Sequence, residues 1–228
     1  MKKLVVIPAR AGSKRLPNKN LKLLDDKPLI MHSVDIARKM FNDNEICIST
    51  DSTKIKSVVE KAGLHVPFLR PKELAQDTSS TEDVLLHALN WYDQNGYEPD
   101  IIILLQPTSP FRKLEDIKNA VQKFSMKIDM VVSVKEGKAN PYFNLYEEND
   151  NGFLKKSKKS TFDRYQDCPV VWEFNGSIYV INTAMLKRKG FSNFDKIIKY
   201  KIDNPIYSLD IDTEYDWLIA NTIIEQKI

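Results

Sequence analysis

The sequence has few of the residues that mark several specialised protein classes. Only two cysteines, Cys47 and Cys168, and three histidines occur in 228 residues. A disulfide framework is therefore excluded, and a metal centre built on thiolates lacks ligands. We expect both cysteines to be free thiols, as in a reducing cytoplasm. With 42% hydrophobic residues and only seven glycines, the composition also excludes a fibrous or disordered chain.

Neither an excess of charge nor a long apolar run is present. The chain has 34 basic and 31 acidic side chains, a net charge of +3, which is too small to favour a nucleic-acid or membrane surface. No run is long enough to span a bilayer, and Pro8 and Arg10 interrupt the first apolar run too early for a signal peptide. We therefore predict a cytoplasmic protein without nucleic-acid or membrane partners, in which local cations meet any bound anion.

Short apolar runs alternate with longer amphipathic patterns along most of the chain. The predicted strands cover Leu4–Pro8, Glu45–Ser49, Asp100–Leu105, Met130–Val134, Gly176–Ile181 and Lys196–Ile202. The predicted helices cover Leu29–Phe41, Thr53–Ala62, Ser80–Tyr92, Lys113–Phe124 and Thr213–Gln226. This rhythm predicts a single α/β domain over residues 1–228, with a three-layer, wound, mostly parallel sheet. Residues 135–171 are polar and aromatic instead, and we interpret them as an inserted arm.

The loop after the first predicted strand is dense in cations. Within ten positions it contains Arg10, Lys14, Arg15 and Lys19. Gly12 permits close backbone approach, and arginine and lysine together suit a triphosphate. A Walker loop is excluded because Pro17 stands where it needs glycine, and no G-x-G-x-x-G pattern occurs. On spacing alone, the alternative is a basic loop that only solubilises the protein.

A second pattern is the acidic pair Asp210 and Asp212 near the end of the chain. On an extended segment the two side chains point to the same face, with their Cα atoms roughly 6.5–7 Å apart. Two carboxylates and the oxygen atoms of a bound triphosphate would suit Mg²⁺. By itself, the pair is a weak signal and favours an exposed strand edge over a metal site.

These motifs belong to a longer pattern. The loop reads IPARAGSKRLPNKNL, and the later segments read STD, LRPKELAQDTSS, LLQPTSPFR, NGSIYV and LDIDTEYD. Together they resemble the acylneuraminate cytidylyltransferases, or CMP-sialic acid synthetases, in the family's order and over almost the whole chain. The resemblance implies a nucleotide-sugar transferase-like fold, with the arm serving in dimerisation and in closing the sugar site.

The resemblance also implies roles for individual residues. The implied nucleotide contacts are Ala9, Arg10, Lys14, Arg15, Lys19, Asn20, Arg70, Ser79 and Thr81. The implied sugar contacts are Gln106, Tyr142, Gln166, Asn175 and Tyr179. The implied Mg²⁺ ligands are Asp210 and Asp212, and the implied catalytic residues are Lys19, Arg10, Asp212 and Gln106. Alternatives are a helix cap for Ser79 and a turn contact for Gln106. The general base is either Asp212 or a metal-bound hydroxide.

The implied reaction transfers CMP from CTP to the anomeric hydroxyl of a nine-carbon acidic sugar and releases pyrophosphate, in a homodimer. Glu173 and Tyr165 stand where some sialic-acid members have arginine, so N-acetylneuraminic, legionaminic and pseudaminic acids all remain candidate substrates. The alternatives are a KDO cytidylyltransferase, a D-x-D glycosyltransferase and a non-catalytic nucleotide sensor. The cation-rich loop disfavours the glycosyltransferase, and the presence of Lys19 and both aspartates disfavours the sensor.

Overall fold

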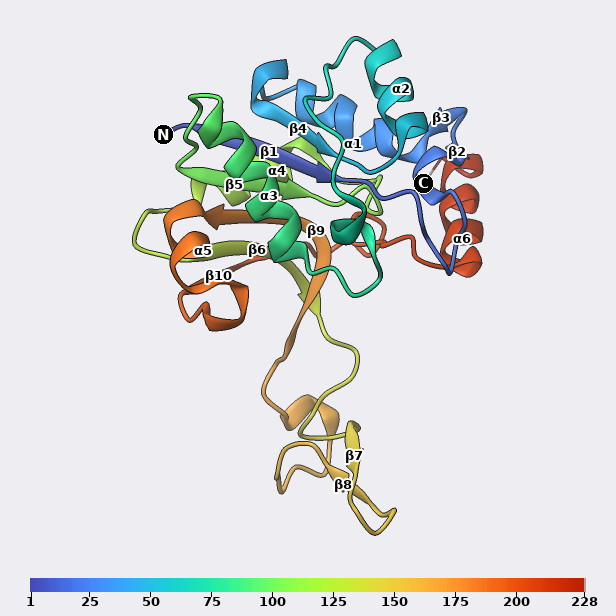
Figure 1. Cartoon of the computed structure of the whole chain (residues 1–228). Coiled ribbons are helices and arrows are strands. Elements are labelled where there is room, and N and C mark those ends of the chain that lie inside the picture. Colours follow the sequence, from blue (N-terminus) through green and yellow to red (C-terminus); the bar gives the residue numbers. More distant parts are fainter. Residues whose placement is uncertain (228) are drawn as a thin grey trace.

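A six-stranded sheet forms the centre of the molecule. The computed structural model describes residues 1–227, and the strand order in its main sheet is β10-β6-β9-β5-β1-β4. All neighbouring strands are parallel except β9, which runs antiparallel to both β5 and β6. Figure 1 shows this sheet crossing the body of the molecule. The predicted wound, mostly parallel sheet is therefore confirmed.

The helices and strands follow the predicted rhythm. The strands are β1 (Lys3–Pro8), β2 (Leu23–Leu24), β3 (Lys27–Pro28), β4 (Ile46–Ser49), β5 (Ile101–Leu105), β6 (Met130–Glu136), β7 (Tyr146–Glu148), β8 (Leu154–Lys156), β9 (Trp172–Asn182) and β10 (Ile197–Lys201). The α-helices are α1 (Leu29–Arg38), α2 (Thr53–Lys61), α3 (Thr81–Gln94), α4 (Leu114–Gln122), α5 (Thr183–Lys189) and α6 (Glu214–Glu225). Short 3-10 helices include η1 (Lys19–Leu21), η3 (Lys72–Ala75) and η4 (Tyr165–Asp167).

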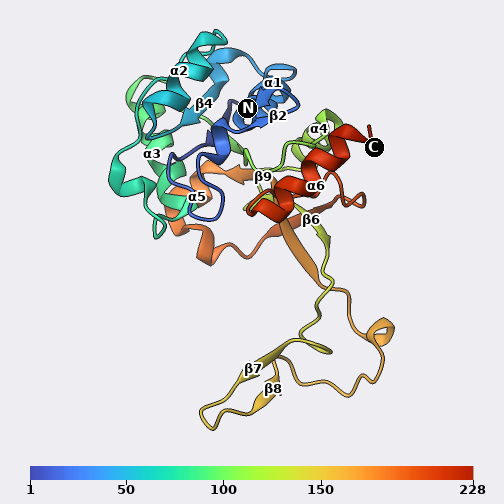
Figure 2. The same cartoon turned by 90° about the vertical axis from the view of Figure 1, so that its right-hand side faces the viewer.

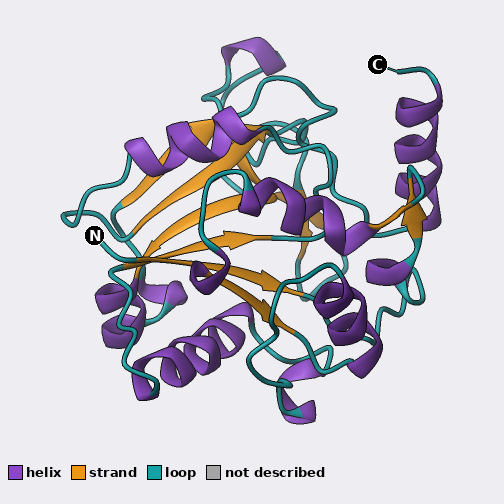
Figure 3. Ribbon diagram, turned by 90° about the horizontal axis from the view of Figure 1, so that it is seen from above, coloured by secondary structure: helices purple, strands orange, loops and turns teal. Residues whose placement is uncertain are grey.

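Two apolar layers bury the sheet. Val5 and Ile7 of β1 face the layer formed by α1, α2 and α4, whereas Leu4 and Val6 face the layer formed by α3 and α5. The alternation follows from the two-residue period of a strand. Figure 3, seen from above, shows helices on both sides of the twisted sheet. Helix α6 packs against a smaller cluster that includes Leu16. Among residues 1–227, no helix combines the length and apolarity needed to cross a membrane.

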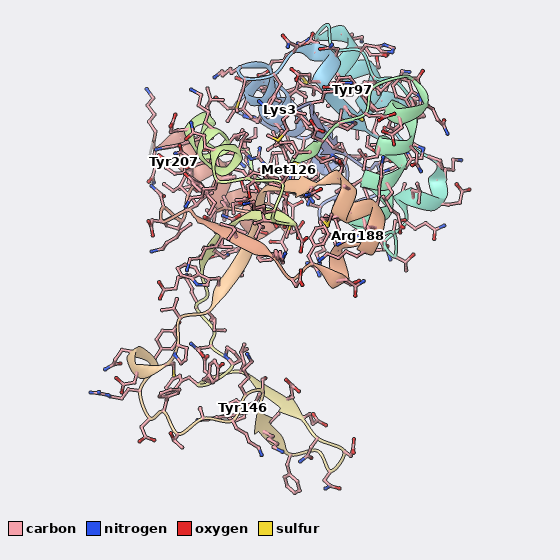
Figure 4. The ribbon with its side chains drawn as sticks, turned by 90° about the vertical axis from the view of Figure 1, so that its left-hand side faces the viewer. Lys3, Tyr97, Met126, Tyr146, Arg188 and Tyr207 are labelled. Carbon is pink, nitrogen blue, oxygen red and sulfur yellow. The ribbon has the colours of Figure 1, made fainter. Side chains whose placement is uncertain are left out.

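The segment between β6 and β9 leaves the body as an arm. It carries the hairpin of β7 and β8 and the short helix η4, and it projects away from the sheet in Figures 1 and 2. Figure 4 places Tyr146 at the far end, well separated from Met126 and Tyr207 on the body. Several apolar side chains of the arm are exposed, among them Phe153 and Leu154 at 69% each.

An irregularity in β9 shapes the sheet beside β6. Val132 pairs with Tyr179 and Val134 pairs with Phe174, so one residue of β6 stands opposite four of β9. The residue on β6 is Ser133, whose hydroxyl donates to the side chain of Asn175 and accepts from the backbone N–H of Ile178. Such bulges bend a strand and redirect its side chains.

The main differences from the predicted elements lie in this same region. Strand β9 begins at Trp172 rather than at Gly176, because the bulge hides the alternating pattern on which strand prediction depends. Helix α5 was not predicted, since its seven residues are too few to give a clear helical period. It begins where the side chain of Asn182 accepts a hydrogen bond from the N–H of Met185.

Asp129 joins three elements at the end of the sheet opposite the pocket described below. Its carboxylate is 2% exposed and accepts from Lys189 Nζ at 2.9 Å and from the backbone N–H groups of Asp195 and Lys196. Asp129→Ala would leave both backbone N–H groups without their acceptor and Lys189 with Asp195 as its remaining partner. We expect this loss to lower the free energy of unfolding by about 3 kcal/mol at pH 7. Urea denaturation of both proteins measures this difference.

The same measurement should depend on pH. Burial alone would raise the pKa of Asp129, but the hydrogen bonds from Lys196, Lys189 and Asp195 outweigh burial and hold the pKa below its ordinary value. The stabilisation is then complete above the unfolded-state pKa of about 4 and is lost as pH falls through the lower folded-state pKa. The difference between the two proteins should stay constant from pH 8 to 5 and shrink below pH 4. The control is the exposed neighbour in Asp195→Ala, and an equal loss there would contradict the prediction.

Candidate active site

The largest cavity opens at the carboxyl ends of β1 and β5. These neighbouring strands lie where the chain order of the sheet reverses, which is where open α/β sheets bind ligands. The cavity has a volume of about 810 Å³, within the range of small-molecule sites. Pro8 at the end of β1, Gln106 after β5 and Thr81 at the start of α3 all line it.

The first loop places its cations along one wall of this cavity. Asn18 adopts a left-handed conformation with φ 55° and leads into η1, which begins at Lys19. The side chain of Asn20 donates to the carbonyl of Arg10 at 3.0 Å and so ties the two ends of the loop together. The cations that line the cavity are Arg10, Lys14, Arg15, Lys19 and Arg70. The wall therefore has the charge that a polyphosphate requires.

Asp77 neutralises part of this wall. Its carboxylate lies 2.8 Å from Arg10 Nη2 and 2.5 Å from Lys14 Nζ, and it also lines the cavity. Hydrogen bonds from Lys14 and Arg10 hold the pKa of Asp77 below its ordinary value, so the carboxylate is ionised. A phosphate group that binds Arg10 and Lys14 would have to replace this carboxylate as their partner.

Asp210 and Asp212 line the same cavity, and Asp212 lies close to two of its cations, Lys19 and Arg15. Lys19 is 8% exposed, and its Nζ donates to Asp212 Oδ1 at 2.6 Å and to the carbonyl of Ile211 at 2.7 Å. Burial raises the pKa of Asp210; a hydrogen bond from Thr108 opposes this effect, whereas the nearby charge of Asp212 adds to it. The backbone N–H of Ile211 also donates to Thr108, which anchors the acidic segment to the loop after β5.

This pair of carboxylates fits a divalent cation. Asp210 and Asp212 line the same cavity, and the pKa of Asp210 is raised mainly by burial and to a smaller degree by repulsion from Asp212. A bound cation would relieve that repulsion. Magnesium prefers few protein carboxylates and completes its shell with water and phosphate oxygens, so the donor set suits Mg²⁺ beside a nucleotide.

Several other predicted residues surround the same space. Arg70 is 5% exposed and lies 3.9 Å from Asp51. Ser79 lines the cavity, but its hydroxyl is also engaged locally, donating to the carbonyl of Glu73; the cap of α3 is Ser80 instead. Tyr179 lies on β9, and burial raises its pKa. The predicted residues that line the cavity are Arg10, Lys14, Arg15, Lys19, Asn20, Arg70, Ser79, Thr81, Gln106, Tyr179, Asp210 and Asp212.

Four predicted residues do not line it. Ala9 is fully buried behind the first loop. Asn175 is 3% exposed, and its side chain bonds Ser133 and Ser208 in the interior. Tyr142 and Gln166 belong to the projecting arm, where the ring of Tyr142 packs against Phe162.

Conversely, the cavity contains residues that the sequence did not single out. Asp77 and Thr108 are two of them. Both lie in segments that resemble the acylneuraminate cytidylyltransferases, and this is the feature of the sequence that could have identified them. Phe174 is another; it is 49% exposed and packs edge-on against Tyr179. Its only signal was its place directly before Asn175.

A family model described as "Cytidylyltransferase" matches residues 4–225. The chain belongs to this cytidylyltransferase family. One similar relative is the CMP-N,N'-diacetyllegionaminic acid synthase of Legionella pneumophila, 37% identical over 99% of this chain and 97% of the relative. Another is an N-acylneuraminate cytidylyltransferase of Streptococcus agalactiae, 33% identical over 96% of this chain but only 52% of the relative. This cytidylyltransferase chain therefore spans about half the length of some of its relatives.

Solved structures agree on the fold. A CMP:2-keto-3-deoxy-manno-octonic acid synthetase complexed with CTP superposes with a TM-score of 0.72 at 20% identity, covering the whole of both chains. A 4-diphosphocytidyl-2C-methyl-D-erythritol synthase from Anaerococcus prevotii superposes with a TM-score of 0.63 at 14% identity, over 98% of this cytidylyltransferase and 99% of that chain. The mostly parallel sheet with helices on both faces is thus shared.

Proposed function

We propose that this cytidylyltransferase transfers CMP from CTP to the anomeric hydroxyl of a nonulosonic acid and releases pyrophosphate. The observation that carries the proposal is the cavity at the ends of β1 and β5, which is lined by both a cluster of cations and a pair of carboxylates. Relatives named for legionaminic acid and N-acylneuraminic acid support the class of sugar. The name of the flagellin-modification relative from Campylobacter coli specifies no sugar.

In the proposed reaction, the first loop binds the triphosphate. Arg10 and Lys14 exchange Asp77 for phosphate oxygens, which keeps their charges paired throughout. Lys19 uses two of its three donors on Ile211 and Asp212, so its remaining donor is available for a substrate oxygen in the cavity. These contacts stabilise the charge that develops on the leaving pyrophosphate.

The sugar reacts from the other side of the nucleotide. The anomeric oxygen forms a bond to the α-phosphorus, the bond from that phosphorus to the pyrophosphate oxygen breaks, and the hydroxyl proton leaves. Gln106, at the end of β5, is placed to orient the sugar by hydrogen bonding. Asp212 is a candidate acceptor for the proton because its carboxylate lines the cavity.

Two conditions of the reaction are also proposed. Asp210 and Asp212 would hold Mg²⁺, which when bound supplies positive charge to the phosphate oxygens. The location would be the cytoplasm, because Cys47 and Cys168 are free thiols and a reducing compartment keeps them so.

The test is pyrophosphate release from CTP and Mg²⁺ with a panel of sugars. N,N'-diacetyllegionaminic acid comes first, because the relative named for it matches 97% of its own length. N-acetylneuraminic, pseudaminic and 2-keto-3-deoxy-octonic acids follow. Turnover with one nonulosonic acid supports the proposal and identifies the sugar. Turnover with the eight-carbon acid alone would favour the KDO alternative, and no release with any sugar would overturn the proposal.

The active form is proposed to be a homodimer joined through the arm. The exposed apolar side chains on the hairpin lie on a segment that no part of the described body covers, and such side chains favour association. Tyr142 and Gln166 do not line the cavity of their own chain. In the proposed dimer they would reach the cavity of the partner, so that each sugar site uses both chains.

The arm predicts a change in oligomeric state. We expect the double variant Phe153→Asp, Leu154→Asp to shift the protein from dimer to monomer and to lower kcat/KM for the sugar by about tenfold or more, because apolar contacts at the centre of an interface contribute most of its affinity. Light scattering coupled to gel filtration measures the mass. Glu147→Gln on the neighbouring strand β7 is the control. A monomeric wild type, or a double variant that remains dimeric, would contradict the prediction.

A further inference from the structure

Arg112 lies beneath the cavity, at the end of the turn that follows β5. Its side chain is 5% exposed and does not line the cavity. The two buried cations that do line it have carboxylate neighbours: Asp212 lies 2.6 Å from Lys19, and Asp51 lies 3.9 Å from Arg70. Within residues 1–227, no carboxylate lies within ion-pair distance of Arg112; burial lowers the pKa of its guanidinium, and the more distant charge of Asp210 opposes this effect. Burying a guanidinium without a paired carboxylate is unfavourable unless other groups accept hydrogen bonds from it. The groups that accept from Arg112 therefore indicate what this residue does.

The guanidinium joins three elements through its hydrogen bonds. Nε donates to the carbonyl and hydroxyl oxygens of Ser177 on β9, both at 3.1 Å. Nη2 donates to the carbonyl of Ser177 at 2.8 Å and to that of Gln106 at 2.7 Å. Nη1 donates to the hydroxyl of Ser33 on α1 at 3.2 Å. The planar fork of arginine suits such a junction, and lysine could not reproduce it.

The contact with Ser177 falls in the bulge of β9. Ser177 belongs to neither ladder, because the pairing with β5 reaches only as far as Ile178 and the pairing with β6 resumes at Phe174. A buried carbonyl that leaves a ladder needs another donor, and Arg112 provides two. A side chain from the loop after β5 therefore supplies the hydrogen bonds that the Ser177 carbonyl does not receive from a neighbouring strand.

This bulge carries part of the cavity floor. Gly176 has a φ of +73°, and a Cβ there would lie 3.5 Å from Asp210 Oδ2, so its backbone lies directly against the Asp210 carboxylate. Phe174 and Tyr179 flank the bulge and line the cavity. Gln106, the other end of the junction, lines the cavity as well. Moving the bulge relative to β5 would therefore separate Gln106 from Phe174 and Tyr179, and would shift the backbone of Gly176 that lies against Asp210.

We propose that Arg112 is a positioning residue for the transfer reaction: from beneath the cavity it fixes the distance between Gln106, which faces the sugar, and the bulge that supports Asp210. This inference rests on the proposed function. Arg112 itself touches no substrate. Because a displacement of about 1 Å in a reacting pair lowers a rate by as much as 100-fold, loss of the junction should act mainly on kcat.

The test compares Arg112→Lys with the wild type in pyrophosphate release and in CTP binding by calorimetry. We expect kcat to fall by about tenfold or more, whereas the Kd for CTP stays within about threefold because the cations of the first loop do not contact Arg112. In Arg112→Ala, free guanidinium below denaturing concentration should raise kcat several-fold, and methylammonium should not. Val59→Ala, in the core of α2, is the control for lost stability.

Several outcomes would overturn the inference. One is a kcat of Arg112→Lys within about twofold of the wild type. A second is a loss of kcat in Val59→Ala equal to that in Arg112→Lys at a matched melting temperature. A third is equal rescue of Arg112→Ala by guanidinium and by methylammonium. If the Arg112 variants do not fold, Ser177→Ala removes one acceptor only, and an unchanged kcat there would overturn the inference too. Failure of the wild type to release pyrophosphate with any sugar would instead refute the proposed function.

Discussion

Asp210→Ala and Asp212→Ala are each expected to lower kcat by about 10³-fold or more, while CTP binding partly survives. Both carboxylates line the cavity, and Asp210 lies against the backbone of Gly176. Each substitution removes one of the two proposed Mg²⁺ ligands and the electrostatic stabilisation that depends on it. The cations proposed to bind the triphosphate are unchanged, which is why nucleotide affinity should fall much less than turnover.

Pyrophosphate release measures turnover, and calorimetry with and without Mg²⁺ measures the Kd for CTP. In the wild type the Kd should depend on Mg²⁺, and in both variants that dependence should largely disappear. Glu214→Gln is the matched control, because this carboxylate lies two residues beyond Asp212, is 67% exposed and pairs with Lys22 outside the cavity. Unchanged turnover in both aspartate variants would refute the metal assignment.

The gathering of most predicted nucleotide-binding residues around one cavity could be predicted because it depends on local rules. Loops after parallel strands meet at one edge of the sheet, so the cations from Arg10 to Lys19 and the residue Gln106 after β5 were expected together. The two-residue spacing of Asp210 and Asp212 likewise placed both side chains on one face, and both line the cavity.

The sugar side depends on features that the sequence does not reveal. Asn175 was expected in the site, but the bulge turns its side chain inward to Ser133, and Phe174 lines the cavity instead. A bulge shifts the alternation by a residue and so reverses which side chains face the site. Arg112 illustrates another limit. Its sequence context shows an arginine after a proline turn, and only the tertiary structure shows that its donors close that bulge.

The arm sets a third limit. Its polar and aromatic composition predicted an insertion, and the structure places residues 137–171 between β6 and β9. In the proposed dimer, the positions of Tyr142 and Gln166 relative to a sugar would depend on a second chain, which neither the local pattern nor a single chain specifies. Their roles therefore remain predictions that the arm variants test.

Lys19→Met is expected to lower kcat/KM for CTP by about 10²–10³-fold, the range found when one preorganised donor to a developing charge is removed. The ammonium group is buried and has fixed partners on Ile211 and Asp212, so it is held in place before substrate binds. Methionine keeps the apolar stem but leaves Asp212 without its 2.6 Å partner, and both kcat and the affinity for CTP should fall.

Lys22→Met provides the matched control for Lys19. Lys22 follows the same 3-10 helix, but its Nζ pairs with the exposed Glu214 at 3.0 Å and lies over the ring of Trp217, outside the cavity. Exposed pairs of this kind contribute at most about 1 kcal/mol to stability, so its kcat/KM should stay within about twofold of the wild type. If both variants lost kcat/KM equally, the reaction would depend on positive charge in general and not on the position of Lys19 beside Asp212.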